Sequence, residues 1–135
     1  MRIVLDSSVL IAAHIARAGV CSELLEDVLI QHQLVVSEYI LDELARKLTD
    51  KFDFPTSSVR AIVKSLAGTA ITVEPASVPP GVCRDPNDLA VLGTALAGEA
   101  DLLITVEKDL LELGKFRGTD IIKPGAFWRR SENAT

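Results

Sequence analysis

Acidic side chains stand directly after two apolar runs of this sequence, at points where buried strands are expected. Asp6 follows the run Arg2 to Leu5, and Glu107 comes two residues after the run Leu102 to Thr105. The carboxyl ends of neighbouring parallel strands meet at one edge of a sheet, where open α/β folds keep their sites. We therefore expect these two carboxylates to converge at that edge.

Two further acidic residues lie on helices that are expected to begin at the same edge. Glu43 borders the apolar stripe of the segment 38–48, and Asp88 lies in the first turn of a helix that starts after Asp85. Four carboxylates that lie close together raise one another's pKa, so such a cluster needs bound cations or a shared proton. Oxygen ligands without His or Cys select Mg²⁺ or Mn²⁺.

Each of these acids also has a purely structural interpretation. Asp85 and Asp109 can cap helices. Asp88 can interact with a helix macrodipole, which is worth a few tenths to about 1 kcal/mol. Glu43 can form an exposed ion pair with Lys47, which contributes little. These separate roles do not explain why all the acids gather at one expected edge, so the metal site is the hypothesis that we prefer.

Apolar runs that alternate with helical periodicity predict a single α/β/α domain with a mostly parallel, five-stranded sheet. Residues 1–128 form the expected domain, and 129–135 form a flexible C-terminal tail. Ser7 or Ser8 is expected to cap the first helix, and Phe127 and Trp128 to pack onto the body. The expected strands are 2–5, 34–36, 70–74, 102–105 and 120–123, and the expected helices are 9–17, 22–31, 38–48, 59–66, 86–97 and 109–113.

The composition limits the classes of protein to which this sequence can belong. Of the 135 residues, 48% are hydrophobic but only 4% are aromatic, so one aliphatic core is expected. No apolar run reaches the roughly 18 residues of a membrane span, which favours a cytoplasmic protein without a membrane partner. Cys21 and Cys83 lack companions at zinc spacing and are expected to be reduced thiols. A net charge of −5 argues against bulk coating of nucleic acid but not against a nuclease that recruits its own cations.

Five segments, taken in order, carry a resemblance to a known family. They are IVLDSSVLIAA, VVSEYILDEL, RDPNDLAVLGTALAGEADLLIT, TVEKDLL and IIKPGAF. Together they resemble the PIN-domain family, specifically the prokaryotic toxin-like PIN proteins of toxin–antitoxin systems, over essentially the whole chain. The resemblance implies a metal-dependent endoribonuclease that hydrolyses RNA to 5′-phosphate and 3′-hydroxyl ends and is restrained by an antitoxin protein. Dimers are common in the family, although no stretch here identifies a homodimer interface.

The resemblance also assigns roles to residues. The family's four acids fall on Asp6, Glu43, Asp88 and Glu107, and its supporting hydroxyls fall on Ser8 and Thr105. We expect Asp6 and Asp88 to bind Mg²⁺ or Mn²⁺ directly. Glu43 and Glu107 either bind the metal through water or position the nucleophile. The fourth acid of the family is usually Asp, so Asp109 or Asp85 remains an alternative to Glu107 for completing the metal site.

Two other functions remain open at this point. The departure at Glu107 and the acidic net charge allow a PIN-like scaffold that binds RNA or protein without cleaving. A phosphoacceptor receiver domain also has acids, a Thr and a Lys at strand ends, which Thr105 and Lys123 match superficially. A receiver domain, however, has paired acids after its first strand and an Asp after its third, where this chain has Asp6-Ser7-Ser8 and Glu74-Pro75.

Overall fold

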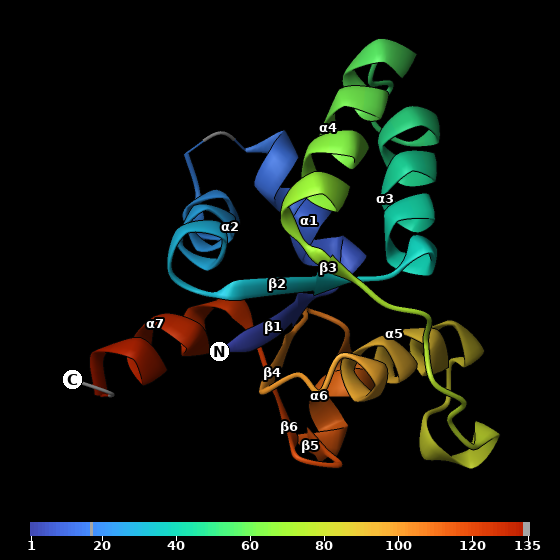
Figure 1. The fold of residues 1–135 in the computed structure, drawn as a ribbon, viewed down its shortest axis with the longest axis vertical. Coiled ribbons are helices and arrows are strands. Elements are labelled where there is room, and N and C mark those ends of the chain that lie inside the picture. The colour runs from blue at the N-terminus through green and yellow to red at the C-terminus, as the bar shows by residue number, and fades with distance from the viewer. Residues whose placement is uncertain (17, 134–135) are drawn as a thin grey trace.

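The computed structural model describes residues 1–16 and 18–133, with side chains as far as residue 130. Its centre is a six-stranded sheet in the order β3-β2-β1-β4-β6-β5, with helices packed on both faces (Figure 1). All neighbouring strands are parallel except β5 and β6. The strands are β1 (Arg2–Leu5), β2 (Gln33–Val36), β3 (Ile71–Thr72), β4 (Leu102–Ile104), β5 (Lys115–Phe116) and β6 (Thr119–Ile122).

Six of the helices were expected in this order, whereas the helices Pro80–Val82 and Pro124–Asn133 were not. They are α1 (Ser7–Ile15), α2 (Val20–Gln31), α3 (Glu38–Asp50), α4 (Thr56–Thr69), the short 3₁₀ helix η1 (Pro80–Val82), α5 (Pro86–Ala97), α6 (Lys108–Leu113) and α7 (Pro124–Asn133). The three-layer α/β/α class with a mostly parallel sheet is confirmed. The helices α3 and α4 pack together as a pair that rises from the sheet (Figure 1).

The sheet has six strands rather than the expected five. The additional strand, β5, pairs with β6 through a two-residue turn at Arg117 and Gly118, both of which have positive φ angles (49° and 88°). Positive φ at both central residues is the geometry of a tight hairpin whose twist matches its strands. A two-residue strand carries no alternation, so the sequence pattern does not reveal it. The predicted strand 70–74 is also shorter in the structure, where β3 covers only Ile71–Thr72.

The C-terminal region is more helical than expected. Helix α7 continues to Asn133, so the segment predicted to be a tail is helical up to that residue, and residues 134–135 lie outside the described part. Arg17, the predicted last residue of the first helix, also lies outside the described residues. The packing of Phe127 and Trp128 is confirmed, since Phe127 is buried and its ring meets the Trp128 ring edge-on at 5.3 Å.

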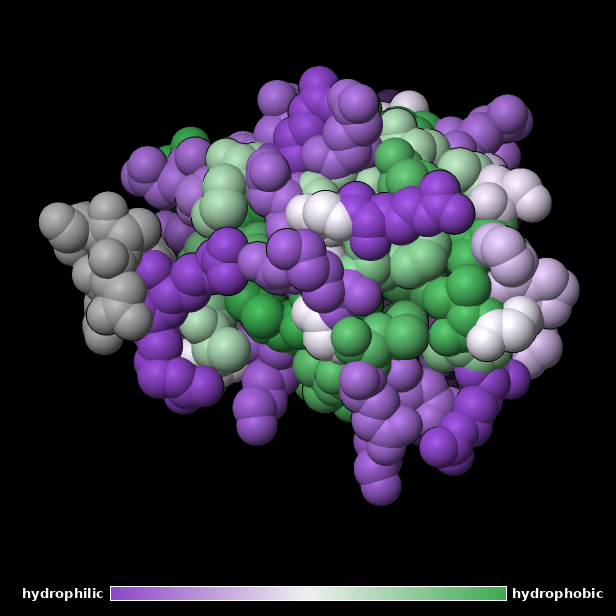
Figure 2. Space-filling model, turned by 90° about the horizontal axis from the view of Figure 1, so that it is seen from below, coloured by the Kyte–Doolittle hydropathy of each residue, from purple (hydrophilic) through white to green (hydrophobic). Residues whose placement is uncertain are grey.

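The core is aliphatic, as the composition predicted, and the register of the sheet fixes the edge where the acids lie. Leu5 pairs with Ile104 between β1 and β4, and the N–H of Asp6 donates to the carbonyl of Ile104 at 3.0 Å. Asp6 and Thr105 therefore leave their strands at the same level. Seen from below, hydrophilic residues surround a central area of hydrophobic ones (Figure 2).

The helices that carry Glu43 and Asp88 are joined by a buried polar contact. The hydroxyls of Ser37, which caps α3, and Thr94, on α5, lie 2.8 Å apart and are fully buried. The same region is closely packed, because a Cβ at Gly93 would clash with the carbonyl oxygen of Ala76. These contacts fix the relative positions of α3 and α5.

In the described part of the chain, no single helix is both long and apolar enough to cross a membrane. Only α1 and α2 taken together reach that length, and they meet at a 110° bend. Both cysteines are free thiols.

Candidate active site

A cleft of about 240 Å³ opens at the carboxyl edge of β1 and β4. All four acids singled out by the sequence line it, and they come from four separate segments. Asp85 joins them, so five carboxylates face the cleft together with two cations. The lining residues are Asp6, Glu43, Arg46, Lys47, Asp85, Asn87, Asp88, Val91 and Glu107.

Asp6 is held at the bottom of the cleft by three hydrogen bonds. Its side chain is only 3% exposed and accepts from the hydroxyl of Thr105 at 2.7 Å, from the N–H of Ser7 at 2.7 Å and from the hydroxyl of Ser8 at 3.4 Å. Burial raises the pKa of Asp6 above 3.8, the bonds from Thr105 and Ser7 partly offset that rise, and nearby Glu107 increases it. Asp6, rather than Ser7 or Ser8, occupies the N-cap of α1, so the capping prediction was wrong.

Glu43 is held on the α3 side of the cleft. Its Oε1 accepts from the Ser7 hydroxyl at 2.6 Å and from the ammonium of Lys47 at 3.1 Å. Burial alone raises the pKa of Glu43, but the bonds from Ser7 and Lys47 outweigh it, and the net pKa lies below 4.5. Tyr39 also hydrogen-bonds Glu43, and burial with this carboxylate raises the pKa of Tyr39 to about 12, which keeps its hydroxyl protonated. Glu43 is therefore ionised at neutral pH.

Asp88 stands opposite, in the first turn of α5. Burial, followed by the charges of Asp85, Asp6 and Glu107, raises its pKa to about 6. The thiol of Cys83 points at Asp88 Oδ2 from 3.7 Å, which is a long and weak contact. Asp85 is the N-cap of α5, as expected, since its Oδ1 accepts from the N–H of Asn87 at 3.0 Å.

The remaining acidic candidates differ in position. Glu107 lines the cleft, and its N–H donates to the hydroxyl of Thr105 at 3.0 Å. Asp109 lies in the first turn of α6 without lining the cleft, and Glu107 takes the N-cap position predicted for Asp109. Of the two alternatives for completing a metal site, only Asp85 faces the same cleft as Asp6.

The carboxylates that line the cleft are the donor groups available to a divalent cation. Within the part of the chain that the structure describes, no three His, Cys, Asp or Glu side chains converge closely enough to form a ready-made metal cage. The chemistry of the donors nevertheless fits Mg²⁺ or Mn²⁺, because all are carboxylates and Mg²⁺ keeps several waters while binding only one or two carboxylates directly. Burial, followed by the neighbouring carboxylates, raises the pKa of Asp88, and a bound cation would offset the second of these effects.

A comparison with known protein families shows which family this chain belongs to. The model of the family described as PIN domain matches residues 2–109. The chain belongs to the PIN domain family. The matched segment contains all the residues that line the cleft. It gives no support to the receiver-type alternative, and Lys123, which matched that alternative, does not line the cleft. No curated protein sequence matches the chain.

Solved structures agree on the fold. Among them are a crystal structure of VapBC2 from Rickettsia felis bound to a DNA fragment from their promoter, and a structure of VapBC-1 from nontypeable Haemophilus influenzae. The first has a TM-score of 0.64 and 13% identity and covers 91% of this PIN protein and 98% of the matched chain. The second has a TM-score of 0.63 and 17% identity, with coverages of 93% and 99%.

Sequence reasoning missed some residues of the cleft. Ser7 bridges Asp6 and Glu43 through its N–H and its hydroxyl, although the sequence indicated it only as a cap. Arg46, Asn87 and Val91 also line the cleft. Arg46 lies three residues after Glu43, and this helical spacing was the available signal.

Proposed function

We propose that this PIN-domain protein is a divalent-metal-dependent endoribonuclease and the toxin of a toxin–antitoxin pair. The observation that supports it most directly is the single cleft shared by Asp6, Glu43, Asp88 and Glu107. These side chains are far apart in sequence, and their mutual repulsion costs stability unless a cation or a substrate makes use of it. Membership of the PIN family favours a nuclease over other uses of such a cleft.

In this proposal Asp6 and Asp88 hold Mg²⁺ or Mn²⁺, with Asp85 as the best-placed additional ligand. When bound, a divalent cation lowers the pKa of an attacking water and offsets charge on the leaving oxygen of a phosphodiester. Thr105 fixes the orientation of the Asp6 carboxylate, as supporting hydrogen bonds do at metal sites.

Glu43 and Glu107 complete the proposed site by holding ordered water. Lys47 neutralises part of the charge of Glu43 and, like Ser7, contacts its Oε1. Glu107 follows the fixed Thr105 and faces Asp6 across the cleft. A water that bridges these carboxylates is well placed to lose a proton to one of them, and the expected products are 5′-phosphate and 3′-hydroxyl ends.

The decisive experiment uses purified protein and labelled RNA with Mg²⁺, Mn²⁺ or EDTA. We expect cleavage with either metal and none with EDTA. Asp6→Asn, which keeps the shape of the side chain, is expected to abolish cleavage while leaving the protein folded by circular dichroism. Cleavage that persists both in EDTA and in the Asp6→Asn variant contradicts the proposal.

The proposed partners are an RNA substrate and an antitoxin protein. Both structural neighbours named above are VapBC proteins, and one of them was solved with promoter DNA, so a partner protein of the antitoxin type is the one that we propose. Expression of the wild-type chain alone is then expected to arrest bacterial growth, whereas Asp6→Asn is tolerated. Equal toxicity of both chains argues against the toxin assignment.

A second candidate is a PIN-like scaffold that binds RNA without cleaving it. Two observations favour it: Glu107 stands where the family usually has Asp, and no three acids form a preformed cage among the described residues. RNA binding with full metal occupancy but without turnover identifies this alternative.

A further inference from the structure

Two cations line the acidic cleft, and they differ in what they contact. The ammonium of Lys47 lies 3.1 Å from Glu43 Oε1 and is already paired. The exposed side chain of Arg46 forms no hydrogen bond or ion pair with any described residue. Asp42 and Asp50 lie four residues before and after Arg46 on α3, a spacing that permits pairing, but among the described residues neither carboxylate forms an ion pair with Arg46. Its guanidinium therefore remains available to a ligand.

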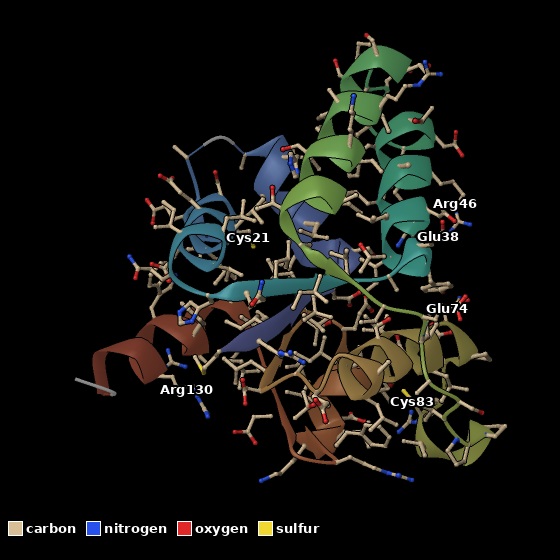
Figure 3. The ribbon with its side chains drawn as sticks, viewed as in Figure 1. Cys21, Glu38, Arg46, Glu74, Cys83 and Arg130 are labelled. Carbon is tan, nitrogen blue, oxygen red and sulfur yellow. The ribbon has the colours of Figure 1, made fainter. Side chains whose placement is uncertain are left out.

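Arg46 lies on the rim of the cleft rather than over its floor. Tyr39, Glu43 and Arg46 follow one another at spacings of four and three residues, so they lie along one face of α3. Figure 3 shows Arg46 projecting from α3 on the side away from α4.

A polyanionic substrate needs such a cation at this rim. Five carboxylates and two cations line the cleft, so a phosphate backbone that approaches it meets net negative charge. A cation that is not committed to a carboxylate can bind a phosphate without first breaking an ion pair. Guanidinium offers two parallel N–H donors to phosphate oxygens, which fixes both position and orientation.

We propose that Arg46 is a substrate-binding residue whose guanidinium holds a phosphate of the RNA backbone next to the bond that is cut. This inference rests on the proposed ribonuclease function and adds a residue to it. A backbone contact carries no sequence information, so Arg46 is expected to strengthen binding to all RNA sequences equally. It acts on substrate position rather than on the chemical step.

The test compares Arg46→Ala and Arg46→Lys with Arg60→Ala. Arg60 is exposed on α4 and does not line the cleft. Its replacement by Ala removes one positive charge, as Arg46→Ala does. Steady-state cleavage gives KM and kcat for each chain. RNA binding at several salt concentrations is measured by fluorescence anisotropy in an Asp6→Asn background, so that this arm does not require cleavage.

We expect Arg46→Ala to raise KM about tenfold with kcat within about twofold of wild type, as for loss of one charge-assisted contact. The salt dependence of RNA binding is expected to become shallower by about 0.7 in log–log slope, as for one lost contact to a single strand. Arg46→Lys recovers part of the KM effect because it keeps the charge but not the paired donors. Arg60→Ala should match wild type.

Three results overturn the inference: equal effects of Arg46→Ala and Arg60→Ala, no effect of Arg46→Ala on KM and salt slope, or a fall in kcat at constant KM. If wild-type protein does not cleave RNA, the proposed function fails. The anisotropy comparison still decides whether Arg46 contacts RNA, so the two failures are distinguishable.

Discussion

The hydroxyl of Thr105 lies 2.7 Å from Oδ2 of Asp6 and donates to it, although 99 residues separate them in sequence. Parallel pairing of β1 with β4 brings the ends of the two strands to one level and makes this bond geometrically available. The same hydroxyl accepts from the N–H of Glu107, so one side chain fixes two of the candidate acids.

Replacement of Thr105 by Val, which has the same shape, is expected to weaken both stability and activity. It removes a hydrogen bond to a buried charged group, worth about 1.5–3 kcal/mol, and lets the pKa of Asp6 rise further. Cleavage should fall by about 10–100-fold, as for loss of a supporting contact at a metal site. Thr105→Ser keeps the hydroxyl and should retain most activity. Equal losses in the two variants, measured by RNA cleavage and urea unfolding, would argue for packing alone.

The burial of Asp88 and the carboxylates around it predict that metal-free protein becomes less stable as pH rises from about 4 to about 6. The folded protein keeps the proton of Asp88 up to about pH 6, whereas the unfolded chain loses it near 3.8. Within this window the folded state binds more protons, so the free energy of unfolding decreases as pH increases. Asp6, whose pKa is also raised, contributes with the same sign.

Urea unfolding in EDTA across this pH range measures that effect. Asp88→Asn should flatten the dependence, because the substituted side chain does not titrate. A wild-type stability that rises across the window, or an unchanged slope in Asp88→Asn, contradicts the argument from charge crowding.

Gly93 and Gly68 form a matched pair of substitutions within helices. A Cβ at Gly93 meets the backbone of Ala76, so Gly93→Ala forces α5 and the preceding loop apart and should cost about 1–3 kcal/mol. Gly68 has nothing within 4 Å of its ideal Cβ, so Gly68→Ala should stabilise α4 by about 0.5–1 kcal/mol. Thermal unfolding measures the change in stability of each variant. A change of the same sign in both variants would contradict the close packing at Gly93.

The buried hydroxyl pair of Ser37 and Thr94 is expected to couple α3 to α5. Thr94→Val alone leaves the Ser37 hydroxyl without its partner and should cost about 1–3 kcal/mol. In the double variant Ser37→Ala/Thr94→Val the loss should be smaller than the sum of the single losses by about 1 kcal/mol. Denaturant unfolding measures these losses in the free energy of unfolding. If they are additive, the two hydroxyls do not stabilise each other.

Much of the fold could be predicted because strong local patterns specify it. Continuous apolar runs gave β1, β2 and β4, and helical periodicity with a cap gave α3 and α5 close to their observed bounds. The two-residue strand β5 was missed because it is too short to show alternation, although its turn and its partner β6 follow it directly in the sequence. Helix α7 was not predicted, because Pro124-Gly125 resembles the end of a strand and the polar residues after Trp128 resemble a tail.

Part of the candidate site could also be predicted, because local sequence patterns place its acids. Acids after strands and at helix starts identified Asp6, Asp88 and Glu107 as neighbours, because the sheet edge collects them. The roles of Ser7 and Arg46 depend on how α1 and α3 face each other, which is a tertiary relationship. The positions of Asp85 and Asp109 depend on how α5 and α6 pack, and only Asp85 lines the cleft.

The measurement that tests the account most directly is calorimetric titration of the metal-free protein with Mn²⁺. We expect wild type to bind the ion, Asp6→Asn and Asp88→Asn to lose most of that affinity, and Asp109→Asn, whose side chain lies outside the cleft, to bind as wild type does. Absence of binding by wild type, or an equal loss in Asp109→Asn and Asp88→Asn, would contradict the claim that these carboxylates share a cleft in order to hold a cation.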